Sequence, residues 1–230
     1  MRALAGRVSG LWVYPVKSMR GQALDAVQVE TRGLVGDRMY AVRDEAGKFG
    51  SGKNTRRFAR MDRLAFWSAR RSGDGVEVLP PDGDWLDGAS ETAAALLSAR
   101  IGRRIQITRE ADVSHFDAAP VHILTAGDLA FLETLSGVRP RCESFRPNVL
   151  IETDERSSDW LGERLRMGGV ELEIVAPTER CLMVNFAPDG RPGPEFLRPL
   201  AQNAEACFGV YAAVLRAGEL ALGEAVARGA

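Results

Sequence analysis

The sequence has few of the residues that build metal clusters, disulfides or hydrolase triads. It contains three cysteines and two histidines among 230 residues. Cys142, Cys181 and Cys207 lie far apart and form no CxxC pair, which disfavours a disulfide framework and a cysteine-rich zinc or iron–sulfur site. His115 and His122 lack the spacing of a zinc motif, and the absence of a GxSxG segment disfavours a Ser-His-Asp hydrolase. We expect His122 to be a packed strand residue.

The sequence also lacks a strong net charge and a long apolar run. Its formal net charge is −1, so no overall field draws it to nucleic acid or to an anionic membrane, and any anion site must be local. No run approaches transmembrane length, and residues 1–7 lack the apolar stretch of a signal peptide. We therefore expect a cytoplasmic protein with neither a nucleic-acid partner nor a membrane partner.

Short strands separated by turns dominate the first third of the chain. The expected strands cover residues 8–14, 24–31, 39–43, 64–70 and 75–79. Strand-forming runs at this spacing, with turn residues between them, predict a barrel or a sandwich. The PPDGD segment at residues 80–84 is the best candidate for a boundary. We expect a β-barrel domain at residues 1–84 and a second domain at residues 85–230, packed so closely that they can form one unit.

The second part of the sequence adds helices to further strands. Residues 91–101 predict a helix with Ser90 as its N-cap and Gly102 as its stop. Another helix is expected after Thr125, with Asp128 three residues on. A short helix at residues 195–203 and strands at residues 105–108, 149–152, 165–175, 210–215 and 220–226 complete the prediction. The chain is expected to be β-rich and mainly antiparallel, of mixed α+β class, with a few short peripheral helices.

The stretch at residues 176–186 carries the strongest chemical signal. A strand-like run leads into it, and Pro177 removes a backbone donor and interrupts the ladder. Cys181 should therefore lie at or just beyond a strand end. Arg180 beside it favours the thiolate, which is a nucleophile or a soft metal ligand. The alternative is that Cys181 is a small buried apolar residue, as many free cysteines are.

The GKFGSGKN segment at residues 47–54 nearly matches a phosphate-binding loop. Asn54 lacks the hydroxyl that would bind magnesium, and the residues that follow do not predict an apolar-faced helix. A basic, glycine-rich loop between two strands is the simpler interpretation. Arg56 and Arg57 after it are candidates for a pocket rim, although a solvated face explains them as well.

Several separate loops each offer groups that bind anions. Arginine supplies a planar fork that matches phosphate, lysine a point charge, and serine and asparagine neutral donors. Taken singly, each cation could belong to a surface salt bridge. The candidates are Lys17, Ser18, Arg38, Arg146, Asn148 and Arg180.

Taken together and in this order, these segments resemble the MOSC family, named for the C-terminal domain of molybdenum cofactor sulfurase. The YPVKS segment at residues 14–18 and the GLVGDR segment at residues 33–38 are similar to the N-terminal β-barrel domain of this family. The FRPN, TERC and CFGVY segments, at residues 145–148, 178–181 and 207–211, are similar to the MOSC domain itself. The resemblance runs from about residue 8 to the end of the sequence.

This resemblance implies a molybdopterin-type molybdenum cofactor, with Cys181 as both the metal ligand and the catalytic residue. The cofactor contacts that it implies are Lys17, Ser18, Arg38, Thr125, Arg146, Asn148 and Arg180. Its relatives include amidoxime-reducing proteins, so the implied activity is reduction of an N-hydroxylated small molecule. Because the sequence has no cysteine cluster for an iron–sulfur domain, electrons would come from a separate redox protein.

Two other functions are compatible with the same residues. The chain could carry the cofactor, or sulfur on Cys181, without reductase turnover. It could also be a barrel-type binding module with no cofactor, because a fold does not determine a function. Metal content and turnover with an artificial electron donor separate these three hypotheses.

Overall fold

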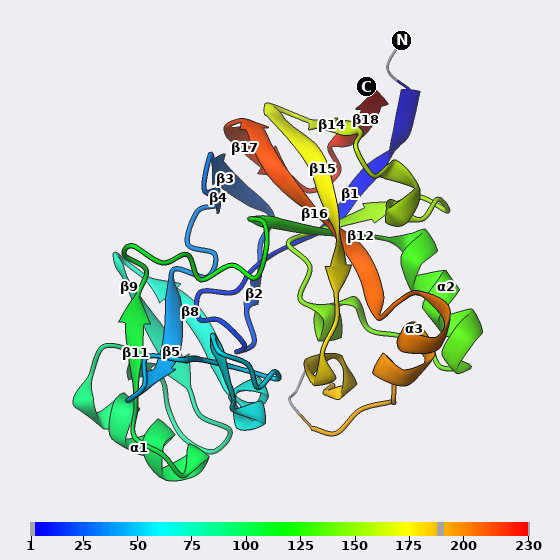
Figure 1. The fold of residues 1–230 in the computed structure, drawn as a ribbon. Helices are drawn as coiled ribbons and strands as arrows, with labels where there is room; N and C mark the ends of the chain where they lie inside the picture. The colour runs from blue at the N-terminus through cyan, green and yellow to red at the C-terminus, as the bar shows by residue number, and fades with distance from the viewer. Residues whose placement is uncertain (1–2, 188–190, 230) are drawn as a thin grey trace.

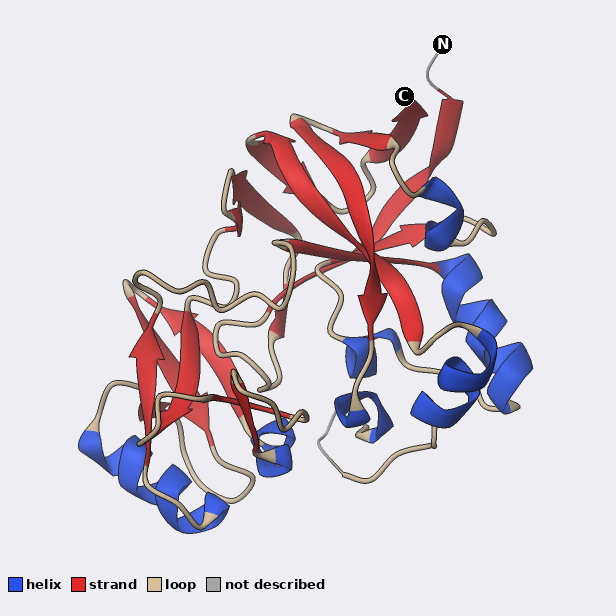
Figure 2. Ribbon diagram, viewed as in Figure 1, coloured by secondary structure: helices blue, strands red, loops and turns tan. Residues whose placement is uncertain are grey.

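The computed structural model describes residues 3–187 and 191–229 of the chain. This part of the chain forms a larger β-barrel and a smaller body of two short sheets, which lie side by side (Figure 1). The three α-helices lie at the outer edges of the two bodies (Figure 2). The expectation of a β-rich, mixed α+β chain with a few short peripheral helices is confirmed.

Seven strands form the barrel, in the order β13, β12, β16, β15, β14, β18 and β1, and the ring closes because β1 also pairs with β13. They are β1 (Ala3–Val13), β12 (Val121–Thr125), β13 (Val149–Glu152), β14 (Arg164–Met167), β15 (Val170–Glu179), β16 (Cys207–Arg216) and β18 (Ala225–Gly229). β12 and β13 run parallel, and the other neighbours in the ring run antiparallel.

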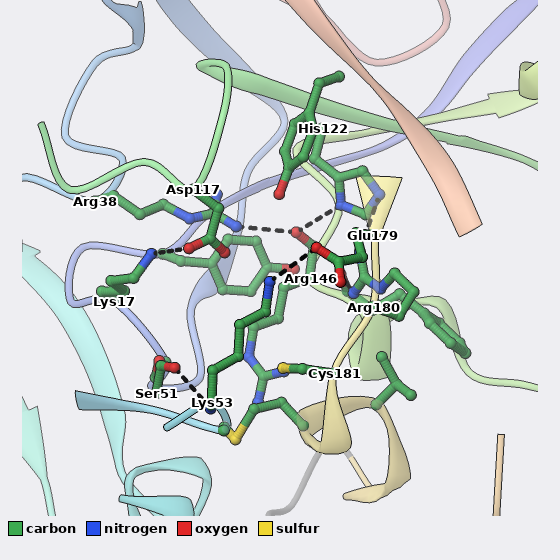
Figure 3. Close-up of a pocket in the computed structure, with 17 residues that line it drawn as sticks. Lys17, Arg38, Ser51, Lys53, Asp117, His122, Arg146, Glu179, Arg180 and Cys181 are labelled. Atoms are coloured by element: carbon green, nitrogen blue, oxygen red, sulfur yellow. Dashed lines mark hydrogen bonds and ion pairs between the residues drawn. The ribbon is translucent and has the colours of Figure 1, made fainter. Parts of the chain in front are cut away.

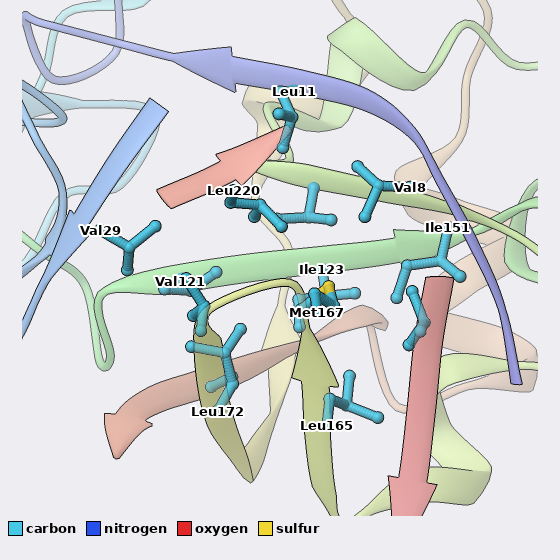
Figure 4. Close-up of a cluster of buried hydrophobic side chains, with 14 of the residues drawn as sticks. Val8, Leu11, Val29, Val121, Ile123, Ile151, Leu165, Met167, Leu172 and Leu220 are labelled. Carbon is cyan, nitrogen blue, oxygen red and sulfur yellow. The ribbon is translucent and has the colours of Figure 1, made fainter. Parts of the chain in front are cut away.

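Apolar side chains from around the ring fill the barrel. Val8 and Leu11 of β1, Ile123 of β12, Ile151 of β13 and Leu165 of β14 are at most 2% exposed and belong to one cluster (Figure 4). In β14, buried and exposed residues alternate, as the two-residue period of a strand requires. Burying each such side chain contributes about 1.5–3 kcal/mol. The barrel is therefore a packed core and supports its loops rigidly.

The smaller body has its own core beneath one helix. Its sheets contain β5 (Tyr40–Asp44), β6 (Phe49–Ser51), β7 (Phe58–Arg60) and β11 (Ile105–Arg109), and β8 (Ser68–Ser72), β9 (Gly75–Leu79) and β10 (Leu86–Asp87). The helix α1 (Glu91–Ile101) packs Leu97 into this core. The Ser90 hydroxyl accepts a hydrogen bond from the amide of Ala93, and Gly102 ends the helix with a φ of 80°. Both predicted helix boundaries are confirmed.

The remaining elements connect and cover the two bodies. The strands are β2 (Gln22–Ala23), β3 (Ala26–Glu30), β4 (Gly33–Leu34) and β17 (Gly218–Ala221), the last three forming one short sheet. The helices are α2 (Ala126–Ser136) and α3 (Leu197–Asn203), with the 3-10 helices η1 (Asp62–Phe66), η2 (Cys142–Phe145), η3 (Ser157–Trp160) and η4 (Leu182–Asn185). Within residues 3–187 and 191–229, no helix is both long enough and apolar enough to cross a bilayer.

Three local predictions are wrong. The single strand expected at residues 220–226 is interrupted, because a turn after Ala221 separates β17 from β18. The strand expected at residues 64–70 starts only at Ser68, because the preceding apolar residues form η1. Consecutive apolar residues do not distinguish a strand from a tight helical turn. Pro177 does not end its strand either: β15 continues to Glu179, and the pairing with β16 shifts register between these two residues. The irregularity accommodates the missing donor of the proline.

The first 80 residues do not form a barrel or a sandwich of their own. β1 closes the larger barrel, β3 pairs with β17 near the C-terminus, and the smaller body extends through α1 to β11. The local sequence does not predict such long-range pairings. The alternation of apolar and polar residues shows which face of a strand is buried, but not which other strand it pairs with. The division into domains at residue 84 stays a prediction.

We predict that the closing strand β1 contributes its stability through inward-facing residues alone. Leu11→Ala should lower the free energy of unfolding by about 2–5 kcal/mol, because it leaves a cavity in the barrel. Leu4→Ala on the same strand, where the side chain is 70% exposed, should change it by less than about 0.5 kcal/mol. Urea denaturation measures both, and equal effects would contradict the assignment of the core.

Candidate functional site

A polar pocket lies where loops of the two bodies meet (Figure 3). Its volume is about 690 Å³ with the part open to solvent included. Five cationic side chains line it, namely Lys17, Arg38, Lys53, Arg146 and Arg180. Cys181 lines the same pocket, so a thiol is placed within a concentration of positive charge.

Cys181 lies two residues beyond the end of β15, at the start of η4. The predicted position beyond a strand end is confirmed. The amide of the preceding Arg180 donates a hydrogen bond of 2.7 Å to the carbonyl of Ala206, which fixes the backbone here. The thiol is half-buried. It can therefore face a ligand in the pocket while the protein shields it partly from water.

The backbone at Gly52 lies close to this thiol. A Cβ atom at Gly52 would lie 3.2 Å from Sγ of Cys181 and 2.6 Å from Cγ of Met183. The second distance is too short for a real side chain, so glycine is what lets this loop approach the sulfur. The basic, glycine-rich loop expected from the sequence thus forms one wall of the pocket.

Three residues that were predicted to contact a cofactor have a left-handed backbone. The φ angles of Ser18, Arg38 and Arg146 are 70°, 48° and 54°. This conformation costs a residue with a Cβ roughly 1–2 kcal/mol, so the surrounding structure must hold it. Such strain gathers at functional sites. The three residues come from three different loops and all line one pocket.

Both lysines of the pocket have carboxylate partners. Lys17 is buried, and its Nζ donates to Oδ1 of Asp117 and to the carbonyl of His115, each at 2.8 Å. Burial acts to raise the pKa of Asp117, but the charge and hydrogen bond of Lys17 outweigh it and lower that pKa. Nζ of Lys53 lies 3.4 Å from Oε2 of Glu179. These pairs leave no excess charge at the lysines.

Arg38 is also paired and in addition holds its neighbours. Its Nη1 donates to Oδ2 of the buried Asp37 at 2.6 Å and to Oδ1 of Asn148 at 3.2 Å. Its Nη2 donates to the carbonyl of Arg146 at 3.1 Å, and its guanidinium lies over the ring of Tyr14. This arginine therefore joins two of the loops that build the pocket.

Arg146 and Arg180 carry charges that the described residues do not balance. Among these residues, their guanidinium groups meet carbonyls and a histidine but no carboxylate, and both Nε atoms are buried without a partner. Burial lowers the pKa of Arg146 to about 10 and also lowers that of Arg180. Guanidinium groups keep their proton in proteins, so both carry a positive charge at neutral pH. Buried cations with free donors fit an anionic ligand such as a phosphate group.

Both histidines are buried, His115 beside Arg38 and His122 beside Arg146 and Arg180. Nδ1 of His115 is 3.1 Å from the carbonyl of Arg38, and Nδ1 of His122 is 3.2 Å from the carbonyl of Arg146. Burial lowers the pKa of His115 to about 4. Burial and the nearby Arg180 lower the pKa of His122 well below its usual value. His122 is a packed residue of β12, as expected, and it also lines the pocket.

The structure brings most of the predicted site residues together. Those that line the pocket are Lys17, Ser18, Arg38, Arg146, Arg180 and Cys181. Asn148 lies behind the pocket wall, where its side chain accepts from Arg38 and from the amide of His122 and donates to the carbonyl of Trp12. It supports the cations without lining the pocket.

Thr125 is not brought to the pocket. Its hydroxyl accepts from the amide of Asp128 and donates to the carbonyl of Glu155, and the side chain of Asp128 completes the capping box of α2. The only donor of this buried hydroxyl is thus used within the fold, and Thr125 does not line the pocket. The expectation that Thr125 contacts a cofactor is therefore not supported by its position, whereas its predicted helix cap is confirmed.

Sequence reasoning missed several residues that line the pocket. Asp117 lies in a segment without any pattern, and Tyr14, Glu179 and Tyr211 were part of recognised segments but had no assigned role. Lys53 belongs to the glycine-rich loop, which was noted but not connected with Cys181. Arg57, a candidate for the rim, instead donates to the carbonyls of Ser114 and Phe116. Only three-dimensional contacts connect these positions.

The chain is a closed-barrel protein with a cysteine at a cationic pocket. Comparison with protein families identifies which barrel family it belongs to. The model of the MOSC N-terminal beta barrel domain matches residues 5–104, and that of the MOSC domain matches residues 110–227. The chain belongs to the MOSC family.

Characterised relatives are similar over most of the chain. Mitochondrial amidoxime reducing component 2 of Bos taurus is 26% identical over 96% of this chain and 82% of its own length. The human protein of the same name is 24% identical over 80% of this chain and 68% of its own. The YuaD protein from Bacillus subtilis shares the fold, with a TM-score of 0.55 and 13% identity over 99% of this chain and 98% of its own.

We predict that Thr125 matters for stability and not for anion binding. Thr125→Ala should lower the free energy of unfolding by about 0.5–2 kcal/mol through loss of the cap, and should leave the affinity for inorganic phosphate unchanged. Thr134→Ala on the exposed face of α2 is the control and should change stability by less than about 0.5 kcal/mol. A loss of phosphate affinity in Thr125→Ala would show that Thr125 contributes to anion binding.

We predict that acid weakens the fold partly through His115. The folded protein keeps His115 neutral down to a pKa of about 4, whereas the unfolded chain takes up the proton near 6.5. Unfolding therefore binds a proton, and stability falls as the pH drops from about 6.5 to about 4. The stability difference between the unchanged protein and His115→Asn should shrink over this range in urea denaturation. Parallel curves would show that His115 is not held neutral.

Proposed function

We propose that the pocket binds a molybdopterin-type molybdenum cofactor and that the protein is an oxidoreductase for N-hydroxylated small molecules, of amidoxime or hydroxylamine type. The observation that carries the proposal is the meeting of Cys181 with two uncompensated guanidinium groups, those of Arg146 and Arg180. The relatives named amidoxime reducing component support the substrate class.

The residues present fit the two ends of such a cofactor. A thiolate is a suitable ligand for a sulfur-rich metal centre, so Cys181 would hold the metal. Arg146 and Arg180 would hold the terminal phosphate, whose charge of about −1.5 to −2 matches their two unbalanced charges. Lys17 and Ser18 line the same pocket and can donate to further oxygen or nitrogen atoms. The described residues contain no cluster of three or more His, Cys, Asp or Glu placed to hold a metal ion.

When bound, the cofactor supplies two-electron redox chemistry at its metal. The chain supplies binding and orientation. Asp117 is the carboxylate nearest Lys17 in the pocket, and its lowered pKa keeps it ionised at neutral pH. Its Oδ atoms can therefore accept hydrogen bonds from a substrate or from water in the pocket. Gly52 keeps one wall close to the sulfur, which limits the space around Cys181.

The proposal includes a separate electron donor, because reduction consumes electrons and the described residues hold no cluster of metal-ligating side chains that could supply them. We propose an external redox protein in this role and a cytoplasmic location, both as first expected from the sequence. A carrier of cofactor or sulfur on Cys181 is the alternative, and the same experiment distinguishes it.

Metal analysis with a matched pair of cysteine variants tests the proposal. Protein from a host that makes the cofactor should contain about one molybdenum per chain and should reduce an amidoxime with viologen as electron donor. Cys181→Ser should lose the metal and the activity. Cys207→Ser should keep both, because Cys207 is half-buried but does not line this pocket.

Each outcome is decisive. Molybdenum without turnover would favour the carrier. Absence of metal from protein with intact Cys181 would contradict cofactor binding, and full metal content in Cys181→Ser would contradict the ligand assignment.

A further inference from the structure

Each of the two histidines faces the backbone carbonyl of one arginine that lines the pocket. Nδ1 of His115 faces the carbonyl of Arg38 at 3.1 Å, and Nδ1 of His122 faces the carbonyl of Arg146 at 3.2 Å. Both rings are at most 3% exposed. Arg38 and Arg146 are also the two arginines of the pocket with a left-handed backbone.

The chemistry of the partners fixes the state of each ring. A carbonyl oxygen only accepts, so Nδ1 must carry the proton in both histidines. Nε2 of His122 lies 3.4 Å from Nη1 of Arg180, and a backbone hydrogen bond to Phe208 also involves this ring. His122 therefore contacts both unbalanced arginines, the carbonyl of Arg146 through Nδ1 and the guanidinium of Arg180 through Nε2.

These hydrogen bonds act on the left-handed backbone of Arg38 and Arg146. A left-handed residue persists only where its surroundings hold it, and a buried carbonyl needs a donor. Each carbonyl belongs to the arginine itself, so a hydrogen bond to it fixes the ψ angle of that residue. Nη2 of Arg38 also donates to the carbonyl of Arg146, which links the two arginines directly. One hydrogen-bond chain thus runs from His115 through Arg38, Arg146 and His122 to Arg180.

We infer that His115 and His122 are positioning residues of the anion site. Each holds one arginine in its left-handed conformation through an Nδ1–H bond to the carbonyl, and His122 also orients Arg180 through Nε2. Neither histidine contacts the ligand as a catalytic group. The inference rests on the anion-binding part of the proposed function and not on the metal or the reaction.

Simple core packing is the competing explanation for two buried histidines. It predicts that a side chain of similar size and no polarity serves as well. The positioning role predicts that the Nδ1 donor itself is needed, and asparagine can supply a donor at a similar place through Nδ2. Leucine and asparagine variants therefore separate the two explanations.

The experiment measures binding of inorganic phosphate to the metal-free protein by calorimetry. His115→Leu and His122→Leu should each weaken binding about tenfold, because a lost hydrogen bond misplaces a cation of the site. His115→Asn should restore most of the affinity. His122→Asn should restore part of it, because its shorter side chain cannot reach Arg180.

Val121→Ala is the control for a purely structural effect. Val121 is a fully buried neighbour on β12 and contacts the barrel core, so the variant lowers stability without touching an arginine. Its phosphate affinity should stay within about twofold of the unchanged protein. If a leucine variant does not fold, the asparagine variants decide the question through the unequal recovery expected at the two positions.

Three results would overturn the inference. They are unchanged phosphate affinity in both leucine variants, an equal loss in Val121→Ala, and failure of the unchanged protein to bind phosphate. None of these depends on molybdenum content or turnover, so a failure here is distinguishable from a failure of the proposed reaction.

Discussion

The buried charge of Arg146 and Arg180 is the constraint on which the rest of the site depends. Placing a cation away from water is costly unless a partner balances it, and the described part of the chain gives these two guanidinium groups none. Lys17, Lys53 and Arg38 nearby each have a carboxylate. The two cations that have no carboxylate partner among the described residues, and so can bind an anion, therefore both lie beside Cys181. An anion bound there would relieve an electrostatic cost that the fold already carries.

The pocket draws on loops that flank three strands of the barrel. Arg180 and Cys181 follow β15, Arg146 precedes β13, and Lys17 follows β1, and all four residues line the pocket. A packed interior holds the strand ends rigidly, and rigid ends can support loops with left-handed residues. The smaller body then adds the wall at Gly52. Neither body carries the site alone.

The sequence predicted what depends on neighbouring residues. Ser90 and Gly102 mark the ends of α1 because capping is a local interaction, and Cys181 lies beyond β15 because strand propensity ends there. Thr125 is placed at a helix cap, where its hydroxyl bonds Asp128 of α2 and the carbonyl of Glu155, so its cofactor contact stays a prediction. Asp117 and the roles of the two histidines were not predictable, because each depends on a contact with a loop far away in the chain. The family motifs located the cations but not which of them were left unbalanced.

The pairing of β1 with β13 has a consequence for how the protein is made. Arg7 of β1 pairs with Glu152 of β13, and Ala3 of β1 pairs with Arg228 of β18. A ribosome adds about 5–20 residues per second, so β1 emerges on the order of ten seconds before its first barrel partner. Throughout that time an apolar strand with free edges is exposed to other nascent chains. The barrel therefore cannot close until residues 149–152 have been made, and β1 has no partner in the ring before then.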